Sequence, residues 1–254
     1  MKTQPKIIIL TYYWPPSGGS GVQRWMYFAK YLQQLGWEPI VVTVNEKKAS
    51  YAVLDATLNQ EVASIRVVKT NTCEPLQWYS FLTTGSKKKG IPQGEVNKTS
   101  IFRKIAAYIR GNFFIPDARK GWGSYAYQAA KKIIDEESID YIVSTGPPHS
   151  THLVGMQLQQ EYKLKWFADF RDPWSSIFYN RQLFRTQRTE RKDLALETNV
   201  LRTAAGVITT VGGELIENLK SIAPNQNYIV LPNGFDEDLF NAVEVTKELS
   251  LIHI

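Results

Sequence analysis

Residues 12–25 read YYWPPSGGSGVQRW, and this stretch decides the fold. A short β-branched run, Ile7 to Leu10, precedes it and is typical of a buried strand, while apolar residues recur at helical spacing after it. The order is therefore strand, glycine loop, helix. Glycine permits the positive φ angles of a sharp turn, and free N–H groups at a helix start favour a phosphate, a carboxylate or a sugar hydroxyl. We expect substrate contacts from Ser17, Gly18, Gly19, Ser20 and Gly21.

The loop matches neither of two common phosphate-binding motifs. No Gly-Lys-Ser/Thr follows it, as a Walker loop requires, and the run from Gly19 to Arg24 lacks the third glycine of a dinucleotide fingerprint. A plain tight turn is the alternative, because every doubly wound sheet needs one after its first strand. Three glycines, two serines and flanking aromatic residues are more than such a turn requires.

Length and composition indicate a cytoplasmic α/β protein. The chain has 254 residues, of which 43% are hydrophobic, enough to build a sizeable core. One cysteine, Cys73, excludes a disulfide framework. The N-terminal apolar run is too short for a signal peptide, and no window approaches the roughly 18 apolar residues of a membrane span.

Basic charge is concentrated in one region. Of the net charge of +6, the segment from Lys87 to Lys120 holds an excess of seven, with nine basic and two acidic residues. We expect residues 83–100, which overlap the start of this segment, to be a mobile insertion, since they are rich in Gly, Ser and Lys. Residues 101–110 alternate apolar and basic positions at helical spacing, which predicts a basic amphipathic helix that lies on an anionic membrane. A domain helix with a solvated basic side is the alternative.

Strand and helix patterns alternate along the rest of the chain, which predicts a Rossmann-like, doubly wound α/β fold with a mostly parallel sheet and helices on both faces. Polar clusters follow three of the expected strands, and ligands of such sheets bind at the carboxyl ends of the strands. The expected strands are 7–10, 39–44, 65–68, 140–145, 165–170, 206–211 and 228–231. The expected helices are 22–35, 101–110, 125–137, 149–162, 182–203 and 212–221, and segment 51–63 is ambiguous.

Five motifs in order resemble a known family. They are the glycine loop, STGPPHSTHL at 144–153, ADFRDPW at 168–174, AAGVITTV at 204–211 and LPNGFD at 231–236. Together they look like the N-terminal half of bacterial family-4-type glycosyltransferases of the GT-B fold. The resemblance covers nearly the whole chain.

That resemblance implies a complete enzyme with two Rossmann-like domains, a nucleotide-sugar substrate, retention of the anomeric configuration, and neither a metal nor another cofactor. Residues 1–235 would form the acceptor-side domain, with Asn233 and Gly234 in the hinge to the donor-side domain. Residues 236–254 would be a linker or the start of that absent domain. We therefore expect this chain to be inactive alone.

The same resemblance indicates catalytic candidates at Arg171, Asp172 and Asp169. Many family members carry His at the position of Arg171, and a guanidinium cannot replace its imidazole as a base at neutral pH. We expect the two carboxylates to hold Arg171 or to accept a hydrogen bond from the acceptor hydroxyl. A structural Arg–Asp pair is the alternative.

A histidine pair follows the fourth expected strand. Pro148 and His149 lie at the expected rim and are substrate-contact candidates, whereas His152, a turn further in, reads as structural. No third Cys, His or carboxylate follows His149 and His152 at the spacing of zinc ligands, so we expect no zinc site.

We therefore expect a retaining glycosyltransferase that uses a glycan or lipid-linked acceptor in cell-surface polysaccharide or glycolipid synthesis. An anionic membrane face would be met through residues 87–120 at the inner side of the membrane. The alternative is a stand-alone, non-catalytic Rossmann-like binding module. A GT-B sugar-nucleotide epimerase is a third reading, and nucleic-acid binding is the least favoured because no known module appears.

Overall fold

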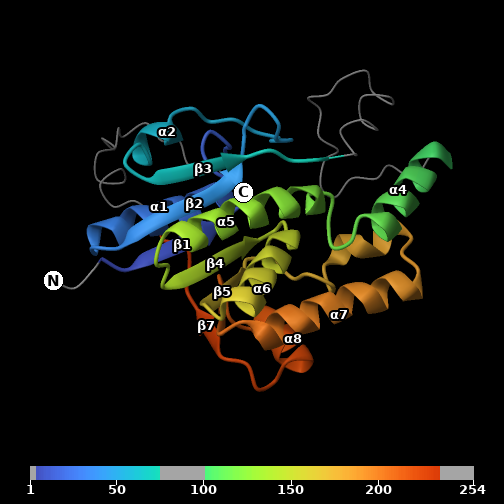
Figure 1. The fold of residues 1–254 in the computed structure, drawn as a ribbon. Coiled ribbons are helices and arrows are strands. Elements are labelled where there is room, and N and C mark those ends of the chain that lie inside the picture. The colour runs from blue at the N-terminus through green and yellow to red at the C-terminus, as the bar shows by residue number, and fades with distance from the viewer. Residues whose placement is uncertain (1–3, 75–100, 235–254) are drawn as a thin grey trace, which may run out of the picture.

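The computed structural model describes residues 4–74 and 101–234 (Figure 1). Seven strands form one parallel sheet in the order β3-β2-β1-β4-β5-β6-β7. The strands are β1 Lys6–Leu10, β2 Glu38–Val44, β3 Arg66–Thr70, β4 Tyr141–Gly146, β5 Lys165–Phe170, β6 Gly206–Thr209 and β7 Tyr228–Val230.

The helices cover both faces of the sheet (Figure 1). They are α1 Ser20–Gln34, α2 Leu58–Glu61, α4 Ile101–Phe113, η1 Lys120–Trp122, α5 Gly123–Glu136, α6 Ser150–Tyr162, η2 Phe178–Leu183, α7 Gln187–Thr203 and α8 Glu214–Ile222. Across these described ranges no helix is both long and apolar enough to cross a bilayer.

Alternation along β1 builds two cores. Ile8 and Leu10 point into the core shared with α5, α6, α7 and α8, whereas Ile7 and Ile9 point into the core shared with α1 and α2. Successive side chains of a strand face opposite sides, so a buried parallel strand must be apolar at every position. This explains why the run from Ile7 to Leu10 is continuous rather than alternating.

The sheet is the predicted Rossmann-like α/β fold. Its strand order reverses between β1 and β4, which lie side by side although about 130 residues separate them in the chain. Doubly wound sheets bind ligands at such a switch point, outside the carboxyl ends of the strands. The loops that follow β1 and β4 therefore define the place to look for a site.

Several element boundaries differ from the expected ones. The expected helix over 182–203 begins at Gln187, because Phe184 adopts a left-handed conformation, φ 48°, that separates η2 from α7. Helix α4 continues to Phe113, beyond its expected end at residue 110, and Gly111 lets it approach the Leu183 carbonyl too closely for a Cβ atom. The ambiguous segment 51–63 holds only the short α2. The predicted insertion 83–100 and the predicted linker 236–254 lie outside the described residues.

Candidate functional site

Three loops meet at the carboxyl edge of the sheet, and Arg171 joins them. Its Nη1 donates to the Gly21 carbonyl at 2.7 Å, its Nη2 to the Pro147 carbonyl at 2.5 Å and its Nε to the Gly146 carbonyl at 3.1 Å. A Cβ atom on Gly21 would collide with Nη1. The structure therefore brings together the predicted glycine loop, the turn after β4 and the turn after β5.

These bonds define what Arg171 does in this conformation. Three of its five N–H donors are occupied by backbone carbonyls, which leaves one donor on each terminal nitrogen. Burial lowers the pKa of Arg171 from its ordinary value, opposed by Asp169 and Asp172, yet a guanidinium stays charged at neutral pH. Its predicted catalytic role stays a prediction, and the observed contacts are those of a clamp between loops.

Asp169 is fully buried and pairs with another arginine. Its carboxylate accepts from Arg24 Nη2 at 2.8 Å, from Trp25 Nε1 at 2.6 Å and from Thr145 Oγ1 at 2.8 Å. The expectation that Asp169 holds Arg171 is thus replaced by an ion pair with Arg24. Asp172, the third catalytic candidate, has an exposed side chain at the rim.

Arg24 is the functional candidate that sequence reasoning missed. Its side chain is 1% exposed, and beyond Asp169 its Nη1 donates to the Leu231 carbonyl at 2.7 Å and to Asn233 Oδ1 at 3.0 Å. One buried guanidinium thereby connects α1, β5 and the segment that follows β7. No spacing pattern marks it, because its partners lie 145 to 209 residues away in the chain.

The glycine loop offers fewer free donors than its composition suggests. The N–H groups of Ser17 and Gly18 are already bound to the carbonyls of Trp14 and Val53, each at 2.9 Å. Gly19 adopts φ 100°, the positive value expected of a sharp turn into α1. In an α-helix the first N–H groups lack partners within the helix, so the first turn of α1 is where a ligand would find donors.

The predicted histidine pair is buried behind the rim. His152 Nδ1 lies 2.8 Å from Ser144 Oγ, which also accepts from Trp166 Nε1 at 2.8 Å. His149 stacks on Trp174 with ring centroids 5.2 Å apart. Both rings pack where a Cβ atom on Gly146 would collide with them. The turn after β4 is therefore shaped around two stacked imidazoles.

Burial keeps these imidazoles neutral. It lowers the pKa of His149 to about 3, and it lowers the pKa of His152 well below the ordinary value, helped by the neighbouring His149. Neither ring nitrogen of His149, nor Nε2 of His152, has a hydrogen-bond partner among the described residues. His149 is 6% exposed, so a substrate contact through it needs the rim to open.

The other predicted contacts lie on the same edge. The Pro148 carbonyl accepts from the Thr151 amide at 3.2 Å, which starts α6. Asn233 and Gly234 are exposed and lie beside α1 after β7. Within the described ranges no group of three or more His, Cys, Asp or Glu side chains is placed to hold a metal ion.

Fold and site together define a Rossmann-like α/β domain. The loops after β1, β4 and β5 meet at the carboxyl edge of its sheet, where such domains bind ligands. The sequence matches no protein-family model and no curated protein.

Solved structures give fold-level likenesses. A glycosyltransferase from Rickettsia africae has 14% identity and a TM-score of 0.47, with 96% of this chain and 47% of that chain covered. A sucrose-phosphate synthase from Thermosynechococcus elongatus has 13% identity and a TM-score of 0.48, with 92% of each chain covered. A ugt transferase from Siraitia grosvenorii in complex with UDP has 11% identity and a TM-score of 0.44, with 91% of this chain and 51% of that chain covered. The chain spans about half the length of the first and third.

Proposed function

We propose that this chain is the acceptor-side, N-terminal half of a retaining glycosyltransferase that moves a sugar from a nucleotide-sugar to a glycan or lipid-linked acceptor. The observation that carries the proposal is the clamp by Arg171. The glycine loop, the Gly146 turn and the Arg171 turn were singled out separately by motif, and Arg171 bonds all three at one rim. The proposed setting is cell-surface polysaccharide or glycolipid synthesis in the cytoplasm.

The chemistry of such a transfer suits this edge of the sheet. As the bond from sugar to diphosphate breaks, negative charge grows on the phosphate and positive charge on the sugar, so fixed donors at the phosphate stabilise the transition state. The first turn of α1 and the two remaining N–H groups of Arg171 are donors of that kind. Asp172 is exposed at the same rim and is the proposed acceptor of the hydroxyl proton.

A separate surface supports the proposed membrane partner. Helix α4 lies at one end of the molecule (Figure 1) and packs on η2. Six large apolar side chains on these two elements, or directly after η2, are exposed. They are Ile105, Tyr108, Ile109, Phe113, Phe178 and Phe184. Lys104 on α4, Arg181 on η2 and Lys120 at the start of η1 are also exposed. Exposed apolar area next to cations fits an anionic lipid surface, which would bring a lipid-linked acceptor to the rim.

The test compares this chain with the full-length gene product. Each is incubated with a panel of nucleotide-sugars, with and without a membrane extract as acceptor, and sugar transfer and hydrolysis are measured. We expect only the longer protein to turn over and Asp172→Asn in it to lower kcat strongly. Turnover by neither protein would leave the alternative, a stand-alone binding module.

Vesicle sedimentation tests the membrane face. We expect the chain to bind vesicles that contain an anionic lipid, and Ile105→Ser with Phe113→Ser to abolish binding. Leu35, which is 76% exposed at the end of α1, provides the control Leu35→Ser. Equal binding by the two variants would contradict the assignment of this face.

A further inference from the structure

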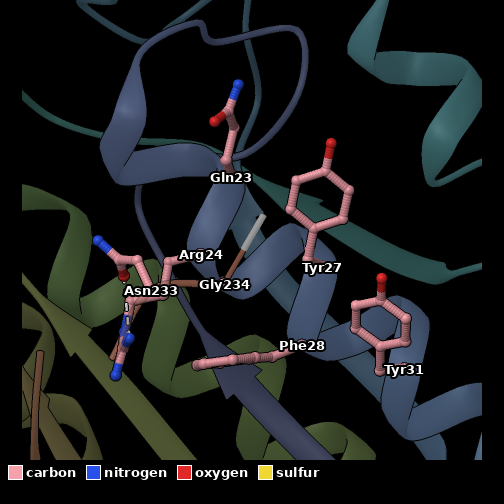
Figure 2. Close-up of a pocket in the computed structure, with 7 residues that line it drawn as sticks. All are labelled: Gln23, Arg24, Tyr27, Phe28, Tyr31, Asn233 and Gly234. Carbon is pink, nitrogen blue, oxygen red and sulfur yellow. Dashed lines mark hydrogen bonds between the residues drawn. The ribbon is translucent and has the colours of Figure 1, made fainter. Parts of the chain in front are cut away.

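A pocket of about 230 Å³ lies between α1 and the segment after β7. Gln23, Tyr27, Phe28 and Tyr31 line it from successive turns of α1, and Asn233 and Gly234 line it from the opposite side (Figure 2). Its volume is below the roughly 300–1,000 Å³ of sites for drug-sized ligands, so it suits a single ring. It runs along α1 from Gln23 to Tyr31.

The residues that line this pocket present no uncompensated charge to a ligand. Among the described residues that line the pocket, only Arg24 is charged. Its charge is compensated by Asp169, whose Oδ1 lies 2.8 Å from Arg24 Nη2. Four of its five N–H donors are used by Asp169, Leu231 and Asn233. An anionic ligand such as a phosphate would find no uncompensated cation there, which argues against a nucleotide.

Arg24 also decides how the Asn233 amide points. An arginine can only donate, so the Asn233 oxygen is the atom that faces it at 3.0 Å and the NH₂ group is turned to the other side. Gln23 adds an exposed amide on the opposite wall. The pocket thus combines aromatic rings, half-buried at Tyr27 and Phe28, with amide groups at one end.

We propose that this pocket binds one neutral sugar ring of a glycan, as a subsite beside the strand-end loops. A pyranose has an apolar C–H face that packs on an aromatic ring and a rim of hydroxyls that pair with amides, and the pocket offers both. Binding here requires no sugar transfer, so the assignment goes beyond the proposed function. Within a glycosyltransferase, the subsite would hold a sugar of the acceptor next to the one that reacts.

Equilibrium binding tests the proposal. The chain is titrated with glucose, galactose, mannose and N-acetylglucosamine and with their disaccharides. Binding is followed by NMR and by intrinsic tryptophan fluorescence, to which Trp25 contributes, with its ring 5.2 Å from that of Phe28. We expect at least one sugar to bind. Tyr27→Ala and Tyr31→Ala should each weaken the affinity for that sugar about tenfold, because each removes one aromatic contact of about 1.4 kcal/mol. Tyr27→Phe should retain most of the affinity.

The matched control is Tyr125→Ala on α5. Tyr125 is 40% exposed and Tyr31 is 41% exposed, so the two changes remove similar surface from different faces. The control should bind like the unaltered chain, and unfolding curves show that each variant is folded. Absence of binding by every sugar, equal weakening by Tyr125→Ala, or displacement of the sugar by inorganic phosphate would each overturn the assignment. Sugar binding without transfer by the full-length protein would refute the proposed function and leave this subsite standing.

Discussion

Acidification should destabilise this protein through its two buried histidines. A histidine in the unfolded chain titrates near its ordinary pKa of about 6.5, whereas burial lowers the pKa of His149 to about 3 and that of His152 well below the ordinary value. Below about pH 6.5 the unfolded state therefore binds protons that the folded state excludes. Their stabilisation is fully present above that pH and is lost as the pH falls toward the folded pKa.

The magnitude follows from the size of the shift. One pKa unit corresponds to about 1.36 kcal/mol, so at pH 5 His149 alone should cost about 2 kcal/mol relative to pH 8, and His152 should add a cost in the same direction. Burial raises the pKa of Asp117, Asp193 and Glu197, and these carboxyls act in the opposite direction. The histidine contribution must therefore be isolated by comparing variants.

Urea unfolding at pH 8 and at pH 5 provides the measurement. The double variant His149→Gln with His152→Gln titrates at neither position, so the difference in unfolding free energy between it and the unaltered chain should shrink by more than about 2 kcal/mol at pH 5. His149→Gln alone should account for about 2 kcal/mol of that change. If the difference stays constant with pH to within about 0.5 kcal/mol, the histidines are not excluded from protonation and the reasoning fails.

Two further predictions concern the buried contacts at the strand ends. Asp169→Asn leaves the Arg24 charge without its partner and should cost about 3–5 kcal/mol in thermal unfolding, whereas Glu61→Gln at a partly exposed pair should cost less than about 1 kcal/mol; equal costs would contradict the burial argument. Gly21→Ala places a methyl group against the Arg171 guanidinium and should cost about 1–3 kcal/mol. The double variant with Arg171→Ala should recover most of that loss, and a fully additive double variant would show that the two residues do not interact.

Much of the fold could be predicted from local pattern. The strand expected over residues 165–170 is confirmed residue for residue, and the run from Ile7 to Leu10 lies within β1. Buried parallel strands are apolar throughout and short, and that signal is local. Boundaries were wrong where tertiary contacts occur: α4 continues to Phe113, past its expected end at residue 110, and Gly111 in this last turn packs closely against Leu183.

The candidate site was predicted in part. Motif reasoning identified the three loops, and the sheet topology brings them to one edge. It assigned Asp169 to the neighbouring Arg171, because the two stand two positions apart in the chain. The structure pairs Asp169 with Arg24 instead, because Asp169 lies in β5 on the face that α1 covers. Arg171 follows the end of β5, and its side chain donates to backbone carbonyls of the neighbouring loops.

The sequence by itself determined the layered α/β architecture, the glycine turn at Gly19 and the residue types at the strand ends, because each depends on spacing or on backbone freedom within a few residues. Only the tertiary structure decided which donors remain free, how the two imidazoles are buried and that Arg24 joins α1 to the segment at Asn233. Those properties depend on contacts between different elements, as between His149 and Trp174 or between Arg24 and Asn233, and no local pattern encodes which partner a buried charge will meet.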